Sequence, residues 1–245
     1  MKDVDQNFID GLKNEYIKNA YTDHMILSAV FSATYTDQQV NVKTANYSYF
    51  RVNTETSGNF LSVIDGIAGS KSSASGTLNE KYYKIFGVRY AQFVKADAEY
   101  RYNWYINRAN SLVGRLFVGC GYPYGNMKVL PFEEAYYGGG ANDIRAWQAR
   151  TLGPGSYLAT EKYPNSVGGN IEYRFKLIWL LEGALFVDAG NVWNINPKEN
   201  RSGAKLNYNF FNQIAIGTGA GLRLNANFFL LRFDLGIKVK DPSMP

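Results

Sequence analysis

A strict alternation of apolar and polar side chains constrains the fold of this chain more than any other feature. In LRFDLGIKVK, residues 231–240, the odd-numbered positions are all apolar and the positions between them are Arg, Asp, Gly or Lys. Successive side chains of a β-strand point to opposite faces, so the pattern predicts a strand with one apolar and one charged face. Residues 94–104 and 171–177 alternate in the same way. The chain is therefore predicted to be all-β.

The alternating segments are also long. We expect strands at residues 24–35, 45–57, 87–105, 111–121, 168–179, 182–193, 212–225 and 228–240, with a possible ninth strand at 8–18. A strand that crosses the hydrocarbon layer of a membrane needs about 9 to 11 tilted residues, whereas a typical strand has about 5 or 6. The lengths favour a transmembrane antiparallel sheet over a soluble β-sandwich.

The connections between these segments alternate in size. Those at 106–110, 180–181 and 225–227 are short, whereas those at 58–86, 122–167 and 194–211 are long. Short turns at one end and long loops at the other are typical of outer-membrane barrels. The aromatic residues Tyr100, Tyr102 and Trp104 end an apolar stripe, so we expect them at the level of the lipid headgroups. A soluble β-rich binding domain is the alternative to a membrane protein.

The composition argues against several classes of function. The sequence has one cysteine, Cys120, and one histidine, His24, which disfavours a disulfide framework, a Cys/His zinc site and a histidine-dependent catalytic dyad. The 26 Lys and Arg residues are scattered among 21 Asp and Glu, so a nucleic-acid site has little support. The most apolar run, residues 177–187, is too short for a membrane helix and is interrupted by Glu182 and Gly183. We expect no enzyme, no metal site and no cofactor.

A glycine-rich segment, GGGANDIRAW at residues 138–147, presents a single arginine, Arg145, next to the bulky Trp147. No strand-to-helix context and no following Lys-Ser/Thr accompany the glycines, so a phosphate-binding loop is disfavoured. Glycine adopts backbone conformations that other residues avoid, which lets a long loop reverse in a confined space. We therefore expect a loop hinge formed by Gly138, Gly139, Gly140, Gly153 and Gly155.

Four motifs occur in a characteristic order: LPFEEAYYGGGANDIRAWQARTLGPGSY at 130–157, NIEYRFKL at 170–177, FVDAGNVW at 186–193 and LRFDLGI at 231–237. Their order and spacing resemble the C-terminal barrel of the BamA/TamA-like outer-membrane insertases, also called the bacterial surface antigen family. The resemblance covers nearly the whole chain. It implies that the sixth extracellular loop folds back into the barrel and carries a V/I-R-G-F tetrad.

The resemblance also implies a contact between that loop and the barrel wall. The tetrad corresponds here to Ile144, Arg145, Ala146 and Trp147, and its arginine is expected to pair with the aspartate of an F-x-D-x-G motif, here Phe186, Asp188 and Gly190. We interpret these residues as a structural loop-to-wall latch, because a guanidinium fork can bind a carboxylate through two hydrogen bonds. Ala146 replaces the usual glycine and Trp147 the usual phenylalanine, so the packing of the loop tip is expected to differ from the family pattern.

Alternation supports the same contact independently. If Leu185, Val187 and Ala189 face lipid, then Phe186, Asp188 and Gly190 face the barrel lumen. An ionised carboxylate is tolerated there, and a glycine leaves room for an incoming loop.

Barrels of the family that the chain resembles have sixteen strands, and its motifs match about strands eight to fifteen. We expect residues 1–245 to form the C-terminal part of an outer-membrane barrel domain, without the final strand, the early strands or the periplasmic POTRA repeats. No signal peptide is visible at the N-terminus. The chain is accordingly expected to be a fragment or one piece of a split gene.

The resemblance implies an outer-membrane protein assembly or translocation factor of a Gram-negative bacterium, acting by strand templating and local membrane disruption. The implied partners are outer-membrane lipids, nascent outer-membrane proteins as clients, periplasmic or lipoprotein accessory subunits and the rest of the barrel, with no nucleic acid. A passive outer-membrane pore or receptor is the alternative. In the first case, charge reversal at Arg145 or Asp188 is expected to damage assembly, and exchanging the two residues is expected to restore it in part. In the second case, charge reversal is expected to change conductance alone.

Overall fold

The computed structural model describes residues 23–39, 45–67, 73–75, 81–157, 165–195, 201–226 and 229–244. The possible ninth strand at 8–18 lies outside these residues. Within the described ranges, the helices are too short or too polar to cross a membrane.

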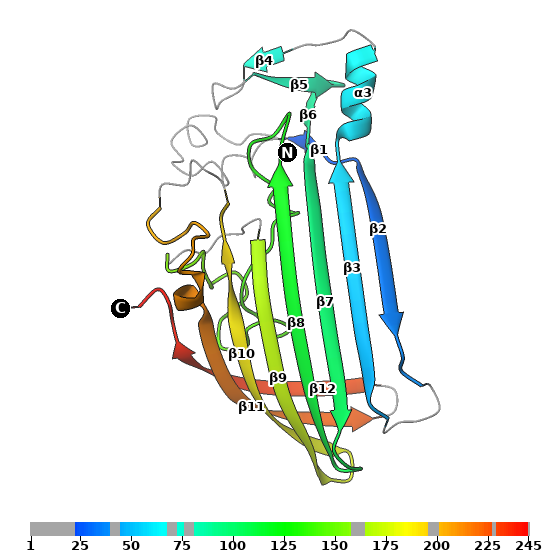
Figure 1. Cartoon of the computed structure of the whole chain (residues 1–245), viewed down its shortest axis with the longest axis vertical. Helices are drawn as coiled ribbons and strands as arrows, with labels where there is room; N and C mark the ends of the chain where they lie inside the picture. The colour runs from blue at the N-terminus through cyan, green and yellow to red at the C-terminus, as the bar shows by residue number, and fades with distance from the viewer. Residues whose placement is uncertain are drawn as a thin grey trace. The chain divides into compact units, whose positions relative to one another are not determined.

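Eight strands form one sheet, in the order β12-β11-β10-β9-β8-β7-β3-β2. A second sheet has the order β1-β6-β5-β4. The elements are β1 (His24–Met25), β2 (Ser28–Thr36), β3 (Tyr47–Ser57), α3 (Asn59–Ile67), β4 (Ser73–Ser75), β5 (Lys81–Ile85), β6 (Val88–Tyr90), β7 (Phe93–Tyr105), β8 (Asn110–Pro123), β9 (Asn165–Ile178), β10 (Leu181–Trp193), η1 (Phe210–Gln213), β11 (Ala215–Ala226) and β12 (Phe229–Lys240). The all-β, antiparallel fold class is confirmed (Figure 1).

The chain divides into two compact units. Unit 1 consists of Met1–Phe31, Asn53–Ala96 and Cys120–Ala135, and unit 2 of Ser32–Val52, Asp97–Gly119 and Tyr136–Pro245. The core of unit 1 is a buried cluster of Ala91, Phe93, Met127, Leu130 and Ala135.

Unit 1 departs from the sequence prediction in three places. The strand expected at 24–35 is divided into β1 and β2, and the one expected at 87–105 is divided into β6 and β7. The hydroxyl oxygen of Ser57 lies 3.2 Å from the carbonyl oxygens of Leu27 and of Ala91, and its single hydrogen can be donated to either. Ser57 thus contacts the chain at both interruptions. The long connection at 58–86 contains α3, β4 and β5, and α3 begins directly after Gly58, whose positive φ of 76° ends β3.

Unit 2 contains β9 to β12, and these strands have 12 to 14 residues each. Three of them lie close to the predicted ranges. β11 begins at Ala215 rather than at residue 212, because residues 210–213 form the 3-10 helix η1. The side chain of Gln213 accepts a hydrogen bond from the indole of Trp193 at 2.7 Å, which fixes this helix against the end of β10.

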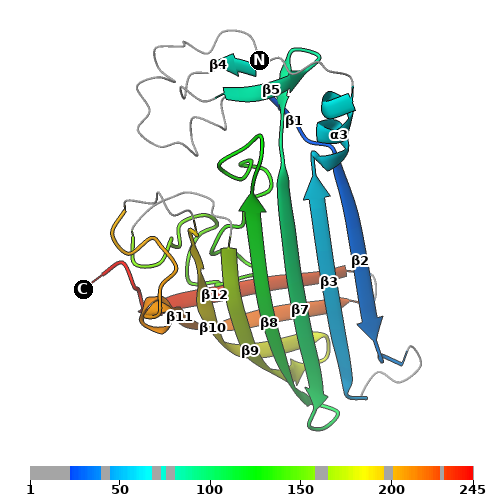
Figure 2. The same cartoon turned by 45° about the horizontal axis from the view of Figure 1, so that its top comes forward.

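The sheet of unit 2 curls strongly. β11 and β12 run crosswise to β8 in both views (Figures 1 and 2). Neighbouring strands of a twisted sheet are rotated by about 20 to 25°, so four steps from β8 to β12 amount to about 80 to 100°. This curl gives the sheet the form of part of a barrel wall.

The two faces of this wall differ in polarity. The apolar stripe of β12 is exposed by between 47% and 72%; its residues are Leu231, Phe233, Leu235, Ile237 and Val239. The opposite face buries the charged residues Glu172, Asp188 and Arg223. A soluble sandwich would show the reverse arrangement, with the apolar stripes packed against each other. Tyr100, Tyr102 and Trp104 lie on the exposed face of β7, and their level in a lipid layer stays a prediction.

The connection between β8 and β9 folds onto the polar face of unit 2. Ile144, Trp147 and Leu152 from this loop form a buried cluster with Ala215 of β11. Nearer the start of the loop, the ring of Tyr136 covers Gly119 of β8 so closely that a Cβ there would lie 2.6 Å from the ring. The structure therefore has the infolded loop that the sequence predicts.

Candidate functional site

The structure brings Arg145 of the loop and Asp188 of β10 together. The guanidinium donates from Nε to Oδ2 at 2.8 Å and from Nη2 to Oδ1 at 2.7 Å, so the carboxylate is bound by two parallel hydrogen bonds. The backbone amide of Arg145 donates a third, at 3.0 Å. Asp188 is fully buried and the Arg145 side chain is 7% exposed. The pair thus fixes both the side chain and the backbone of the loop tip.

Two further carboxylates, on neighbouring strands, contact the same arginine. Nη1 of Arg145 lies 2.6 Å from Oε2 of Glu172 on β9 and 3.6 Å from Oδ2 of Asp234 on β12. The guanidinium also lies over the ring of Phe186, with its central carbon 3.4 Å from the ring centroid. One loop residue therefore contacts three strands, an arrangement that the motifs did not predict.

Strand register explains why these groups meet. Phe186 lies opposite Glu172, and Asp188 lies opposite Asn170. On the other side of β10, Asp188 lies opposite Gly217 of β11, which contributes no side chain between the strand and the loop. The amide of Asn170 donates to Oδ1 of Asp188 at 2.9 Å and to the carbonyl of Asp143 at 2.8 Å. Asn170 thus orients the carboxylate and binds the loop as well.

The other residues of the tetrad and of the F-x-D-x-G motif line the same contact. Ile144 is 1% exposed, and its Cδ1 would lie 3.1 Å from a Cβ on Gly190. Ala146 lies against Gly217 and Gly236. Lys238 of β12 lies over the ring of Trp147, with its nitrogen 4.9 Å from the ring centroid.

The predicted hinge glycines lie at the two ends of a closed turn. The amide of Gly140 donates to the carbonyl of Trp147 at 2.8 Å, and the amide of Arg150 to the carbonyl of Gly138 at 2.9 Å. Gly139, Gly140, Gly153 and Gly155 have positive φ angles, whereas Gly138 does not. A Cβ on Gly138 would instead lie 3.0 Å from Leu152, so close approach of the two ends explains that glycine. Their role as a hinge stays a prediction.

The charges of the loop tip depend on burial. Burial opposes the charge of Arg145, but hydrogen bonds to Asp188 and Glu172 outweigh it and raise the pKa of the guanidinium above its ordinary value. Burial raises the pKa of the Asp143 carboxyl, and the Gly139 amide and Arg115 offset only part of this effect. The described residues contain no group of three or more His, Cys, Asp or Glu side chains placed to hold a metal ion. The role of Arg145 and Asp188 as a loop-to-wall latch stays a prediction.

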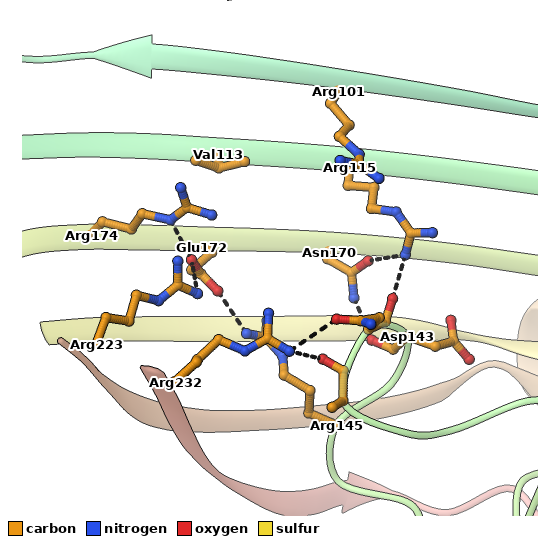
Figure 3. A pocket seen from close by; sticks show the side chains of 12 residues that line it. Arg101, Val113, Arg115, Asp143, Arg145, Asn170, Glu172, Arg174, Arg223 and Arg232 are labelled. Atoms are coloured by element: carbon orange, nitrogen blue, oxygen red, sulfur yellow. Dashed lines mark hydrogen bonds and ion pairs between the residues drawn. The ribbon is translucent and has the colours of Figure 1, made fainter. Parts of the chain in front are cut away.

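Sequence reasoning missed Glu172, Asp234 and Asn170 as members of this site. A signal for all three was present, because they alternate with apolar residues and so belong to the polar face of β9 and β12. The pattern gives the face of a strand but not its register against the neighbouring strand. The contacts of Arg145 with Glu172 and Asp234 therefore required the three-dimensional arrangement. Figure 3 shows the contact with Glu172.

Comparisons with known proteins place the chain in a family. Residues 28–244 match the Omp85 superfamily domain. Over 90 residues the chain is 36% identical to the outer membrane protein assembly factor BamA of Neisseria meningitidis serogroup B. The matched segment covers 31% of this chain and 11% of that protein. The crystal structure of BamA from Haemophilus ducreyi lacking POTRA domains 1–3 is similar with a TM-score of 0.49 and 14% sequence identity. That match covers 88% of this chain and 52% of the other.

The chain thus spans about half of the solved BamA chain that it matches. The Omp85 match covers all eight strands of the larger sheet and the infolded loop. The resemblance to BamA/TamA-like proteins that the motifs indicated is confirmed. The chain belongs to the Omp85 superfamily.

Proposed function

We propose that this chain is the barrel portion of an outer-membrane protein assembly or translocation factor of a Gram-negative bacterium. Membership of the Omp85 superfamily and a relative named an outer membrane protein assembly factor support this proposal. The observation that carries it is the loop tip held on the polar face of the sheet by Arg145 and Asp188. We interpret this contact as a loop-to-wall latch that keeps the loop inside the barrel.

The surface chemistry fits a protein that works in the lipid layer. The exposed apolar stripes of β9, β10 and β12 contact outer-membrane lipids, because such stripes are unfavourable in water. A nascent outer-membrane protein is the client, and the backbone groups of an exposed strand edge pair with its incoming strand. The protein acts by this templating and by local disruption of the membrane, without catalysis and without a cofactor. The complete assembly also includes periplasmic or lipoprotein accessory subunits and the remaining strands of the barrel.

A passive outer-membrane pore or receptor is the second candidate. The observation that favours it is a cavity of about 380 Å³ on the polar face, whose lining includes six arginines and which would suit a selective passage for solutes. A pore needs the cavity, whereas an assembly factor needs the loop contact. The two candidates therefore differ in what a change at Arg145 does.

The test is charge reversal at the loop tip, with Arg145→Glu introduced into the protein in its native host. The matched control is Arg108→Glu, which reverses a charge in the exposed turn between β7 and β8. An assembly factor predicts that folded outer-membrane proteins decline in the Arg145 variant and not in the control. Unchanged assembly together with altered single-channel conductance would instead identify a pore.

The structure changes one expectation for this test. Exchanging the two charges, with Arg145→Asp and Asp188→Arg together, places a new carboxylate beside Glu172 and Asp234. Repulsion from these two groups prevents rescue, so the exchanged protein is expected to be as defective as either single variant. Arg145→Lys separates charge from geometry, because a lysine keeps the positive charge but cannot form the two parallel hydrogen bonds to Asp188.

A further inference from the structure

Beside the loop contact, the polar face of unit 2 holds a cavity that the proposed function does not use. Its volume is about 380 Å³. Figure 3 shows the arginine side chains that surround it, which come from strands β7, β8, β9, β11 and β12 and from the loop; they are Arg101, Arg115, Arg174, Arg223, Arg232 and Arg145. A cavity with this lining offers hydrogen-bond donors from several directions.

The ion pairs around this cavity leave an excess of positive charge. Glu99 binds Arg51, Arg101 and Arg115, and Glu172 binds Arg145, Arg174 and Arg223. The cluster also contains three aspartates and one more arginine, namely Asp143, Asp188, Asp234 and Arg232. It therefore has seven arginines and five carboxylates in all. The formal balance of seven against five is therefore +2.

Arg223 gives an independent indication that a ligand belongs in this cavity. Its side chain is 5% exposed, and its Nη2 forms an ion pair with Oε1 of Glu172. Nevertheless, among the residues that the structure describes, its Nε and Nη2 atoms are buried without an acceptor in hydrogen-bonding geometry, and both carboxylate oxygens of Asp234 are buried without a donor in such geometry. A guanidinium carries five donor hydrogens, and leaving buried donors unsatisfied is unfavourable. A rotation of the Arg223 guanidinium toward the cavity, which this side chain lines, would bring these donors to an oxyanion there.

We propose that this cavity binds a phosphoryl group, held by Arg223 and Arg174 with Arg101 from the opposite wall. A phosphoryl group carries a charge between −1 and −2 near neutral pH, which matches the formal excess of the cluster. Its oxygens accept paired hydrogen bonds from guanidinium groups approaching from different sides. The cavity is also large enough for a phosphoryl group carried on a small organic molecule.

The test is a calorimetric titration of the full chain in detergent micelles with inorganic phosphate at low ionic strength. The proposal predicts saturable binding that Arg223→Gln and Arg174→Gln each weaken by at least about fivefold. The matched control is Arg108→Gln, which removes an exposed arginine from the turn between β7 and β8, outside both the cavity lining and the cluster, and its affinity stays within about twofold of the wild type.

A second arm identifies the source of the phosphoryl group. Glucose 1-phosphate is titrated beside inorganic phosphate, with glucose as the blank. Tighter binding of the ester assigns the cavity to a phosphorylated solute, and tighter binding of the ion assigns it to free phosphate. Absence of saturable binding to both, or equal binding by wild type and Arg174→Gln, would overturn the proposal. The Arg174 side chain is 35% exposed, so this variant tests the cavity even if Arg223→Gln does not fold.

Discussion

Gly236 of β12 lies directly against the backbone of Ala146 at the loop tip. A Cβ on Gly236 would lie 2.8 Å from the amide nitrogen and 2.9 Å from the Cα of Ala146. Backbone atoms cannot rotate away as the end of a long side chain can. The sheet thus accepts the loop only because β12 has no side chain at this position.

The first prediction concerns this position. Gly236→Ala is expected to lower the free energy of unfolding by about 2 to 3 kcal/mol, the upper range for overpacking a closely packed site. Gly114→Ala is the matched control, since a Cβ on this β8 glycine would meet no atom of the described residues within 4 Å. We expect the control to be neutral or slightly more stable. Equal effects of both substitutions in urea unfolding of the detergent-solubilised protein would contradict the close approach.

A second prediction uses the neighbouring glycine of β11. A Cβ on Gly217 would lie 2.6 Å from the Cβ of Ala146, whereas its next contact, with Trp147, is an ordinary 3.4 Å. Gly217→Ala is expected to cost about 1 to 3 kcal/mol. Adding Ala146→Gly removes the clashing methyl group and should restore most of this loss. A double variant no more stable than Gly217→Ala alone would show that the two residues do not touch.

Much of this arrangement follows from the sequence alone. The period of two assigns Phe186 and Asp188 to one face and Leu185 and Val187 to the other, and the structure buries the first pair and exposes the second. The period of two predicts the faces correctly because a strand has only two faces and, in this sheet, charged side chains are tolerated only on the one that faces away from lipid. The interruption between β6 and β7 gave no such signal, because the run from Val88 to Val94 contains neither Gly nor Pro.

The partners of Arg145 were harder to predict for a different reason. Alternation places Glu172 and Asp234 on the polar face, but their distance from Arg145 depends on the register of three strands and on the path of the loop. The turn at residues 179–180 sets the register between β9 and β10. Tertiary contacts of this kind are not encoded in any single segment.

A third prediction tests one of these unforeseen partners. Glu172 is the carboxylate that Arg145, Arg174 and Arg223 share, and its side chain is 7% exposed. Glu172→Gln leaves buried guanidinium groups without compensation, so a loss of about 3 kcal/mol or more is expected. Glu182→Gln on β10 is the control, because within the described part of the chain Glu182 accepts a single long hydrogen bond, from Asn225 at 3.4 Å. A loss at Glu172 no larger than the control's would argue against a desolvated cluster.

A fourth prediction concerns pH. Burial raises the pKa of Asp143 in the folded protein above its ordinary value of 3.8. A carboxyl of this kind stabilises the fold at pH values below its pKa in the unfolded chain. It loses that contribution as the pH rises through its higher pKa in the folded protein. The thermal midpoint of Asp143→Asn relative to wild type should therefore increase between about pH 4 and pH 7. A difference that stays constant or decreases over this range would contradict the burial of this carboxyl.

The central claim is that Arg145 and Asp188 form a desolvated pair that holds the loop on the sheet. A double-mutant cycle with Arg145→Gln and Asp188→Asn, measured by the free energy of unfolding in detergent, tests it most directly. Each single variant is expected to lose about 3 to 5 kcal/mol, and the coupling energy to be at least about 2 kcal/mol. A coupling energy below about 0.5 kcal/mol, as for an exposed ion pair, would contradict the account.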